Sequence, residues 1–189
     1  MLKRGGLILR RGFLKLIFLG GLLIFGAALE AASPENPEMT MTSVDLIECG
    51  DKKLEFKILC NPRWPTQRNT QSLKLIIDAT AQAEVAVTIY KSEEVGLTFS
   101  DLTPTALKRV FEYSDEFKYA RTFVNRQKAV RVEAQPLGQP ETHLLDYFFI
   151  RDSHLYRISY AARNAGQFRK YLPLFAEMMR SFEFIHLNF

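Results

Sequence analysis

The order of secondary-structure signals along residues 43–189 restricts the fold more than any other feature of this sequence. Short segments typical of strands come first, a helix follows, more strands come next, and a second helix lies near the C-terminus. The clearest strand is Glu84 to Tyr90, in which Val85, Val87 and Ile89 alternate with small or polar residues. Strands in consecutive runs followed by helices favour an α+β fold, with an antiparallel sheet covered by helices.

The other elements can be placed approximately. Ser100 or Thr103 can cap the first helix, and the second helix is expected from Phe168 to Arg180, where Pro173 should kink or divide it. Arg151 to His154 is a short polar connection typical of an antiparallel hairpin. The remaining strands are expected at 44–47, 54–59, 73–78, 129–134, 142–150 and 155–161.

Residues 1–31 have the organisation of a secretory signal peptide. Basic residues come first, an apolar stretch runs from Leu16 to Leu29, and small residues surround Ala31, after which cleavage is expected. The apolar stretch is short for a transmembrane helix, so no transmembrane segment should remain after cleavage, whereas an uncleaved signal would anchor the N-terminus. Residues 32–42 form a polar linker to the folded domain at 43–189. We expect export to the periplasm or, in a phototroph, to the thylakoid lumen.

Within the signal, the segment Arg10-Arg11-Gly12-Phe13-Leu14-Lys15 resembles the core of the twin-arginine export motif. Leu9 departs from that motif, which usually has Ser or Thr before the two arginines. The alternative is an ordinary secretory signal that happens to contain two adjacent arginines. The sequence leaves both routes open.

The net charge of +4 and the pI near 9.1 would suggest a polyanion as partner. However, residues 1–31 hold five of the 25 basic residues and only one of the 21 acidic residues. Residues 32–189 therefore carry 20 of each and are formally neutral. Export and neutrality both argue against nucleic-acid binding.

Three segments, taken in order, resemble the PsbP-like family. This family comprises the extrinsic PsbP protein of photosystem II and bacterial relatives of unknown function, and the Mog-type Ran-binding proteins are structurally similar. The segments are Phe56 to Trp64, Leu155 to Ala162, and Phe168 to Phe184 with its Ser-Phe-Glu-Phe ending. Arg126 to Ala129 departs from the family, in which many members have a Gly shortly before the Ala. The resemblance implies an α/β/α sandwich around an antiparallel sheet, and a binding or assembly role without catalytic residues.

No recognised catalytic or metal-binding motif occurs in the sequence. Asp152, Ser153 and His154 include the residue types of a hydrolytic triad, but consecutive residues in a hairpin turn point apart, so a polar turn is expected. His143 should lie at the opposite end of a strand pair from His154, and neither these two nor His186 has a second ligand at the spacing of a known metal site. No cofactor is predicted, and a Ca²⁺ or Mn²⁺ site of scattered carboxylates would leave little trace in a sequence.

The only two cysteines, Cys49 and Cys60, are expected to be free and mostly buried. An even number of cysteines in an exported chain suggests a disulfide. A chain reversal at Gly50-Asp51 would instead leave Cys60 eight residues beyond Lys52 on the returning strand. That separation exceeds the limit of about 7 Å between Cα atoms that a disulfide requires. Free thiols are therefore predicted, unless no hairpin forms there.

Five residues are candidate contacts for a partner. Arg157, Arg163, Arg169 and Lys170 lie close together in sequence, and an acidic protein or an anionic lipid could dock on them; a solvated face is the simpler interpretation. Trp64, between two prolines, could stack on a ligand or close one end of the core. The aromatic residues that follow the first helix are expected to pack in the core, and an exposed subset would mark a contact surface.

These features predict an exported, non-catalytic accessory or binding module that docks on a membrane-associated assembly or a partner protein. The first alternative is an envelope hydrolase whose pocket is assembled from residues distant in sequence. The second is a protein that binds a small ligand or a divalent metal.

Replacing both Arg10 and Arg11 by Lys tests the export route. Because the charge of the signal is unchanged, an ordinary secretory signal should tolerate the pair of substitutions, whereas a twin-arginine signal should lose export. The measurement is the fraction of protein recovered outside the cytoplasm, with the single change Arg4→Lys as the control. Unchanged export would leave only the general secretory route.

Overall fold

The computed structural model describes residues 46–90 and 97–185. The predicted signal peptide at 1–31, the predicted linker at 32–42 and His186 lie outside the described residues.

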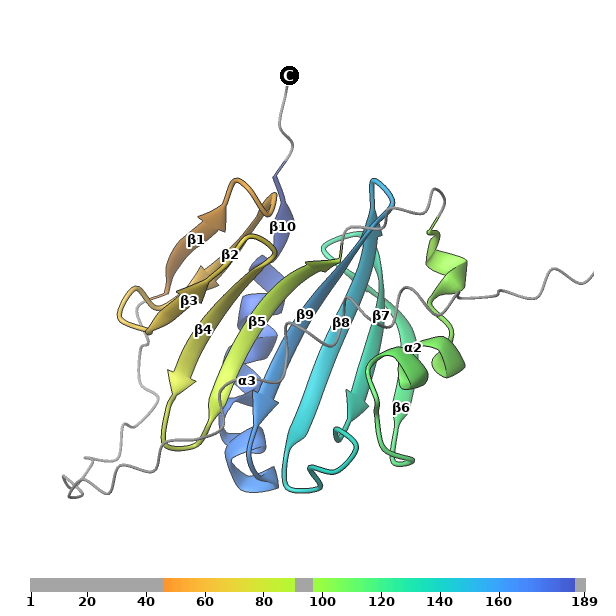
Figure 1. Ribbon diagram of the computed structural model, residues 1–189. Coiled ribbons are helices and arrows are strands. Elements are labelled where there is room, and N and C mark those ends of the chain that lie inside the picture. Colours follow the sequence, from red (N-terminus) through yellow and green to blue (C-terminus); the bar gives the residue numbers. More distant parts are fainter. Residues whose placement is uncertain (1–45, 91–96, 186–189) are drawn as a thin grey trace, which may run out of the picture. The chain divides into compact units, whose positions relative to one another are not determined.

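Seven antiparallel strands form the main sheet (Figure 1). In spatial order they are β3 (Thr66–Arg68), β4 (Ser72–Asp78), β5 (Ala83–Tyr90), β9 (His154–Ala162), β8 (His143–Arg151), β7 (Gln127–Ala134) and β6 (Lys118–Val124). The hairpin between β8 and β9 turns at Asp152 and Ser153, whose φ angles of 49° and 60° are those a two-residue turn requires. The polar turn predicted at this point is confirmed.

A smaller sheet and three helical segments complete the structure. The small sheet has the order β1 (Ile47–Asp51), β2 (Phe56–Cys60) and β10 (Glu183–Phe184). The helical segments are the 3₁₀ turn η1 (Phe99–Asp101) and the α-helices α2 (Pro104–Val110) and α3 (Ala165–Ser181). Thr103 caps α2 by accepting a hydrogen bond from the Ala106 amide at 3.2 Å.

Both faces of the main sheet are covered. On one face Tyr160 of β9 stacks on Phe168 and Phe175 of α3, with ring centroids 5.0 and 5.2 Å apart, and the small sheet packs into the same core. On the other face, buried residues of β7 and β8 such as Phe148 pack with Leu107 of α2. The predicted α/β/α arrangement around an antiparallel sheet is confirmed.

Pro173 was predicted to kink or divide this helix; α3 continues through Pro173, so it is not divided. Proline removes one hydrogen bond, and the carbonyl left without its partner belongs to Arg169, an exposed residue that water can reach. The following residues, Leu174 and Phe175, are buried in the core and hold the next turn in place. Asn164 caps the helix by accepting from the Gln167 amide at 2.9 Å.

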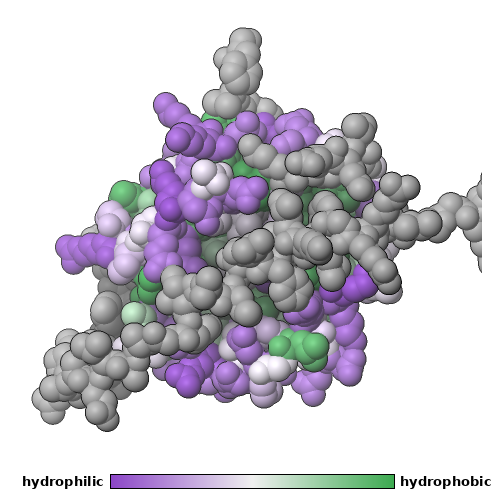
Figure 2. Space-filling model, viewed as in Figure 1, coloured by the Kyte–Doolittle hydropathy of each residue, from purple (hydrophilic) through white to green (hydrophobic). Residues whose placement is uncertain are grey.

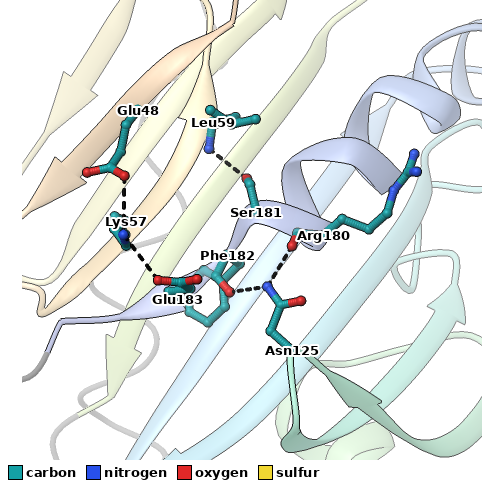
Figure 3. Close-up of polar contacts among 8 residues, drawn as sticks. All are labelled: Glu48, Lys57, Leu59, Asn125, Arg180, Ser181, Phe182 and Glu183. Atoms are coloured by element: carbon teal, nitrogen blue, oxygen red, sulfur yellow. Dashed lines mark hydrogen bonds and ion pairs between the residues drawn. The ribbon is translucent and has the colours of Figure 1, made fainter.

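Hydrogen bonds connect the end of α3 to the turn between β6 and β7 and to β2, which are distant from it in sequence (Figure 3). The amide nitrogen Nδ2 of Asn125 donates to the carbonyls of Arg180 and Phe182 at 2.6 and 2.7 Å. The hydroxyl of Ser181 accepts from the Leu59 amide at 2.8 Å. The Ser-Phe-Glu-Phe ending thus closes the core, since Phe182 is almost completely buried.

Contrary to the prediction of free thiols, Cys49 and Cys60 form a disulfide, with their Cα atoms 5.7 Å apart. The prediction placed the chain reversal at Gly50-Asp51, but β1 extends through Asp51 and the turn occupies residues 52–55. Cys49 therefore pairs with Ile58, and Cys60 lies diagonally across the two strands, within reach of it. The predicted turn lay about three residues too early in the sequence, and this error placed the two cysteines too far apart for a disulfide.

Removing the disulfide should destabilise the domain by about 3 kcal/mol, because it closes a short loop of sequence separation 11. The test compares urea unfolding of the exported protein with that of the Cys49→Ser, Cys60→Ser double variant. A reducing agent should destabilise the unsubstituted protein equally and leave the double variant unchanged. An intact mass without the two-dalton deficit of a disulfide would contradict this assignment.

Candidate docking site

A buried ion pair lies at the centre of the main sheet, on the face that α2 covers. Asp146 of β8 is completely buried, and its Oδ2 atom is 2.8 Å from Nη2 of Arg157 on the neighbouring β9. The hydroxyl of Tyr113 donates a hydrogen bond to the same carboxylate oxygen. The guanidinium carbon of Arg157 lies 4.7 Å from the ring centroid of Phe111. The positive charge of Arg157 therefore lies between the Asp146 carboxylate and the ring of Phe111, and Tyr113 gives that carboxylate a second hydrogen bond.

The pKa directions follow from burial and from the two charges. Burial raises the pKa of Tyr113 well above its usual value, and the negative charge of Asp146 raises it further. Burial is the largest single influence on the pKa of Arg157 and would lower it, but the charge interactions and hydrogen bond with Asp146, together with those of Tyr113 and Tyr90, outweigh burial and raise that pKa. Tyr113 therefore stays protonated and Arg157 stays charged at physiological pH, which suits a structural ion pair rather than proton transfer.

An open groove runs beside this cluster, along α2. It has a volume of about 500 Å³ and shares Tyr113 with the buried cluster. Leu137 forms part of its wall and is 70% exposed, although its backbone is fixed by a 2.7 Å hydrogen bond from its amide to the Glu112 carbonyl. The other lining residues are Pro104, Thr105, Lys108, Arg109, Glu112 and Phe117.

The groove combines apolar side chains with cations at its edge. Lys108 pairs with Asp115, whereas Arg109 is exposed and has no ion-pair partner among the residues that the structure describes. Figure 2 shows that hydrophilic side chains cover much of the described surface in this view, while hydrophobic ones show in small separate areas. A partner side chain that is apolar and adjacent to a carboxylate would match the groove.

Comparisons with known proteins bear on the fold. Nothing matches among protein-family models or among curated proteins. Among solved structures, cyanobacterial PsbP (CyanoP) from Synechocystis sp. PCC 6803 has a TM-score of 0.57 at 15% identity, over 80% of this chain and 99% of that chain. The Saccharomyces cerevisiae Ran-binding protein Mog1p has a TM-score of 0.52 at 9% identity, over 76% of this chain and 97% of that chain. This chain has a PsbP-like fold.

Within the PsbP-like domain, the five predicted contact residues do not form one surface. Arg157 is engaged with Asp146 on the α2 side of the sheet. Trp64 is half-buried in the turn after β2 and packs against the core on the α3 side, which favours its role in closing that core. Arg163, Arg169 and Lys170 are exposed at the end of β9 and the start of α3. Docking by these three residues stays a prediction.

Among the residues that the structure describes, the histidines and carboxylates do not converge. His143 pairs with Ala162 and His154 pairs with Arg151, so the two histidines lie at opposite ends of the β8–β9 pair, as predicted. No group of three or more His, Cys, Asp or Glu side chains suited to a metal ion occurs within 46–90 and 97–185. None of the helices in the described ranges is long and apolar enough to cross a membrane.

Sequence reasoning missed the groove and the partner of Arg157. Asp146 lies in a strand whose other residues are mainly hydrophobic, and a single acid there is the available signal for a buried ion pair. Leu137 follows Pro136 and precedes Gly138, so it reads as an ordinary turn residue. Its exposure depends on how the turn packs against the end of α2, which is a tertiary contact.

Substituting Asp146 by Leu should lower the free energy of unfolding by about 3–5 kcal/mol, because Arg157 would remain buried without its counter-charge. The double variant Asp146→Leu, Arg157→Met should recover most of the loss. The control is Glu84→Gln, which removes a more exposed ion pair with Lys74 and should cost less than about 1 kcal/mol. Urea unfolding measures all three, and a double variant no more stable than Asp146→Leu would contradict a simple charge pair.

Proposed function

We propose that the domain is an exported, non-catalytic binding module that docks on a membrane-associated partner protein through the groove beside α2. The observation that carries the proposal is Leu137, a large apolar side chain that is 70% exposed on a fixed backbone at the wall of that groove. An exposed apolar side chain on a hydrogen-bonded backbone costs little backbone ordering on binding and gains from burial.

Three further features support the proposal. The disulfide between Cys49 and Cys60 suits an oxidising compartment outside the cytoplasm, which agrees with the predicted signal peptide. The structurally similar Mog1p is a Ran-binding protein, which illustrates that this fold can serve protein binding. In the central ion pair, Arg157 and Tyr113 both hold Oδ2 of Asp146 within the fold, and both keep their protons at physiological pH, which suits a framework better than a reacting centre.

Binding of the exported protein to membranes from its source organism tests this function. The Leu137→Asp variant should bind at least about tenfold more weakly, because a charge would have to be buried in the contact. The control is Ile47→Asp on β1, which also alters an exposed large apolar residue, 48% exposed, and should bind normally. Protease treatment of the membranes should remove the binding site. Binding that survives protease treatment or the Leu137→Asp substitution would contradict the proposal.

A further inference from the structure

We propose that the free edge of β6 binds an acidic, extended segment of a partner protein, which adds to the main sheet as a further strand. This inference rests on the proposed function in that it assumes a protein partner, but it concerns a surface other than the groove. Four observations carry it: the open edge, the local charge, one exposed aromatic ring, and the unfavourable charge pattern for pairing with a second copy.

The edge strand β6 provides the backbone N–H and C=O groups with which a further strand would pair. β6 is the last strand of the main sheet and pairs only with β7 among the described strands (Figure 1). It has seven residues, whereas β3 at the other edge has three. Short edge strands are one way in which proteins avoid unwanted pairing, and β6 does not use it. A long free edge can accept the main-chain hydrogen bonds of an added strand.

The β6–β7 hairpin concentrates positive charge. Residues 118–134 hold five of the 20 basic residues found in 32–189, and only one acidic residue, Glu133. Glu133 is occupied by Lys118 at 3.3 Å and by Arg131 at 3.2 Å. The other three basic residues are exposed and have no ion-pair partner among the described residues: Arg121, Arg126 and Lys128. The neutral domain therefore carries a locally cationic edge, which complements an acidic segment.

Phe123 provides an exposed apolar anchor within the same positively charged hairpin. Its side chain is 67% exposed, and it pairs across the hairpin with Lys128. The backbone beside it is held firmly, because Asn125 in the adjoining turn donates to the carbonyls of Arg180 and Phe182 (Figure 3). An exposed aromatic ring on a fixed strand gains from burial at little cost in conformational entropy.

The charge pattern also selects against a second copy of this chain. If two β6 strands paired in antiparallel register about their middle residue, Arg121 would face Arg121. Like charges directly opposite each other destabilise a strand pair. A partner strand with Glu or Asp on the corresponding face would instead place opposite charges together. The edge thus favours an acidic partner over self-association.

The probe is a capped octapeptide of alternating Glu and Val, titrated into the exported protein and followed by backbone amide NMR and hydrogen exchange. We expect saturable binding, with slowed exchange confined to amides of 118–124. The same peptide N-methylated at alternate residues keeps its charge but cannot complete the hydrogen-bonded ladder, so it should not bind. Equal binding of the methylated peptide, or no binding of either peptide at millimolar concentration, would overturn the proposal.

Charge reversal locates the site. The double variant Arg121→Glu, Lys128→Glu should weaken peptide binding about tenfold or more. The matched control Lys52→Glu, Lys53→Glu changes the same number of exposed charges in the turn between β1 and β2 and should bind within about twofold of the unsubstituted protein. Equal weakening by both variants, dimerisation through 118–124, or a preference for anionic phospholipid vesicles over the peptide would overturn the proposal. If peptide binding fails while Leu137→Asp still blocks membrane binding, only this inference is lost and the proposed function stands.

Discussion

The central strand β8 has buried residues on both of its faces, and the other layers of the structure are assembled against it and its neighbour β9. The buried residues of β8 alternate between two cores: Leu145 and Phe149 face α3, whereas Leu144 and Phe148 face the side of α2. The middle of such a strand gives a charge little access to water, and the charged residue at its end, Arg151, is only half-buried. Asp146 is tolerated there because Arg157 and Tyr113 both bind its Oδ2 atom, although Oδ1 has no hydrogen-bond partner among the described residues. The ion pair therefore restricts β8 and β9 to one register, since a shift by one residue would move Asp146 into the opposite, apolar core.

The sequence was most informative where burial follows a simple period. The alternation in β5 and the polar turn between β8 and β9 predicted those elements closely, because their pattern is local. β6 was missed because its exposed and half-buried residues follow no clean alternation. β10 has two residues and exists only through its pairing with β2. The disulfide was missed for a related reason, since its geometry depends on the register of β1 and β2, which a small error in the turn changes.

The contrast between local sequence pattern and tertiary contact also applies to the candidate sites. Arg157 was singled out for its charge, yet its charge is used inside the fold, and the sequence gives little indication that Asp146 is its partner. Leu137 and Phe123 were not distinguishable from core residues by type, and only their exposure marks them. Exposure of an apolar side chain is a tertiary property, because it depends on which neighbouring element fails to cover it.

The two proposed surfaces differ in the physical basis of recognition. The groove beside α2 can recognise a side chain mainly through burial, so that part of its contribution should depend little on ionic strength, whereas a contact with the cations at its edge would weaken as salt rises. The edge of β6 would recognise an extended backbone through hydrogen bonds and an acidic sequence through charge, so its contribution should fall as salt rises. Net neutrality of residues 32–189 conceals this difference, because the β6–β7 hairpin has five basic residues and one acid, and its excess positive charge is balanced by acids located elsewhere. Local charge at a sheet edge, rather than the total charge of the chain, is therefore the quantity that bears on partner choice.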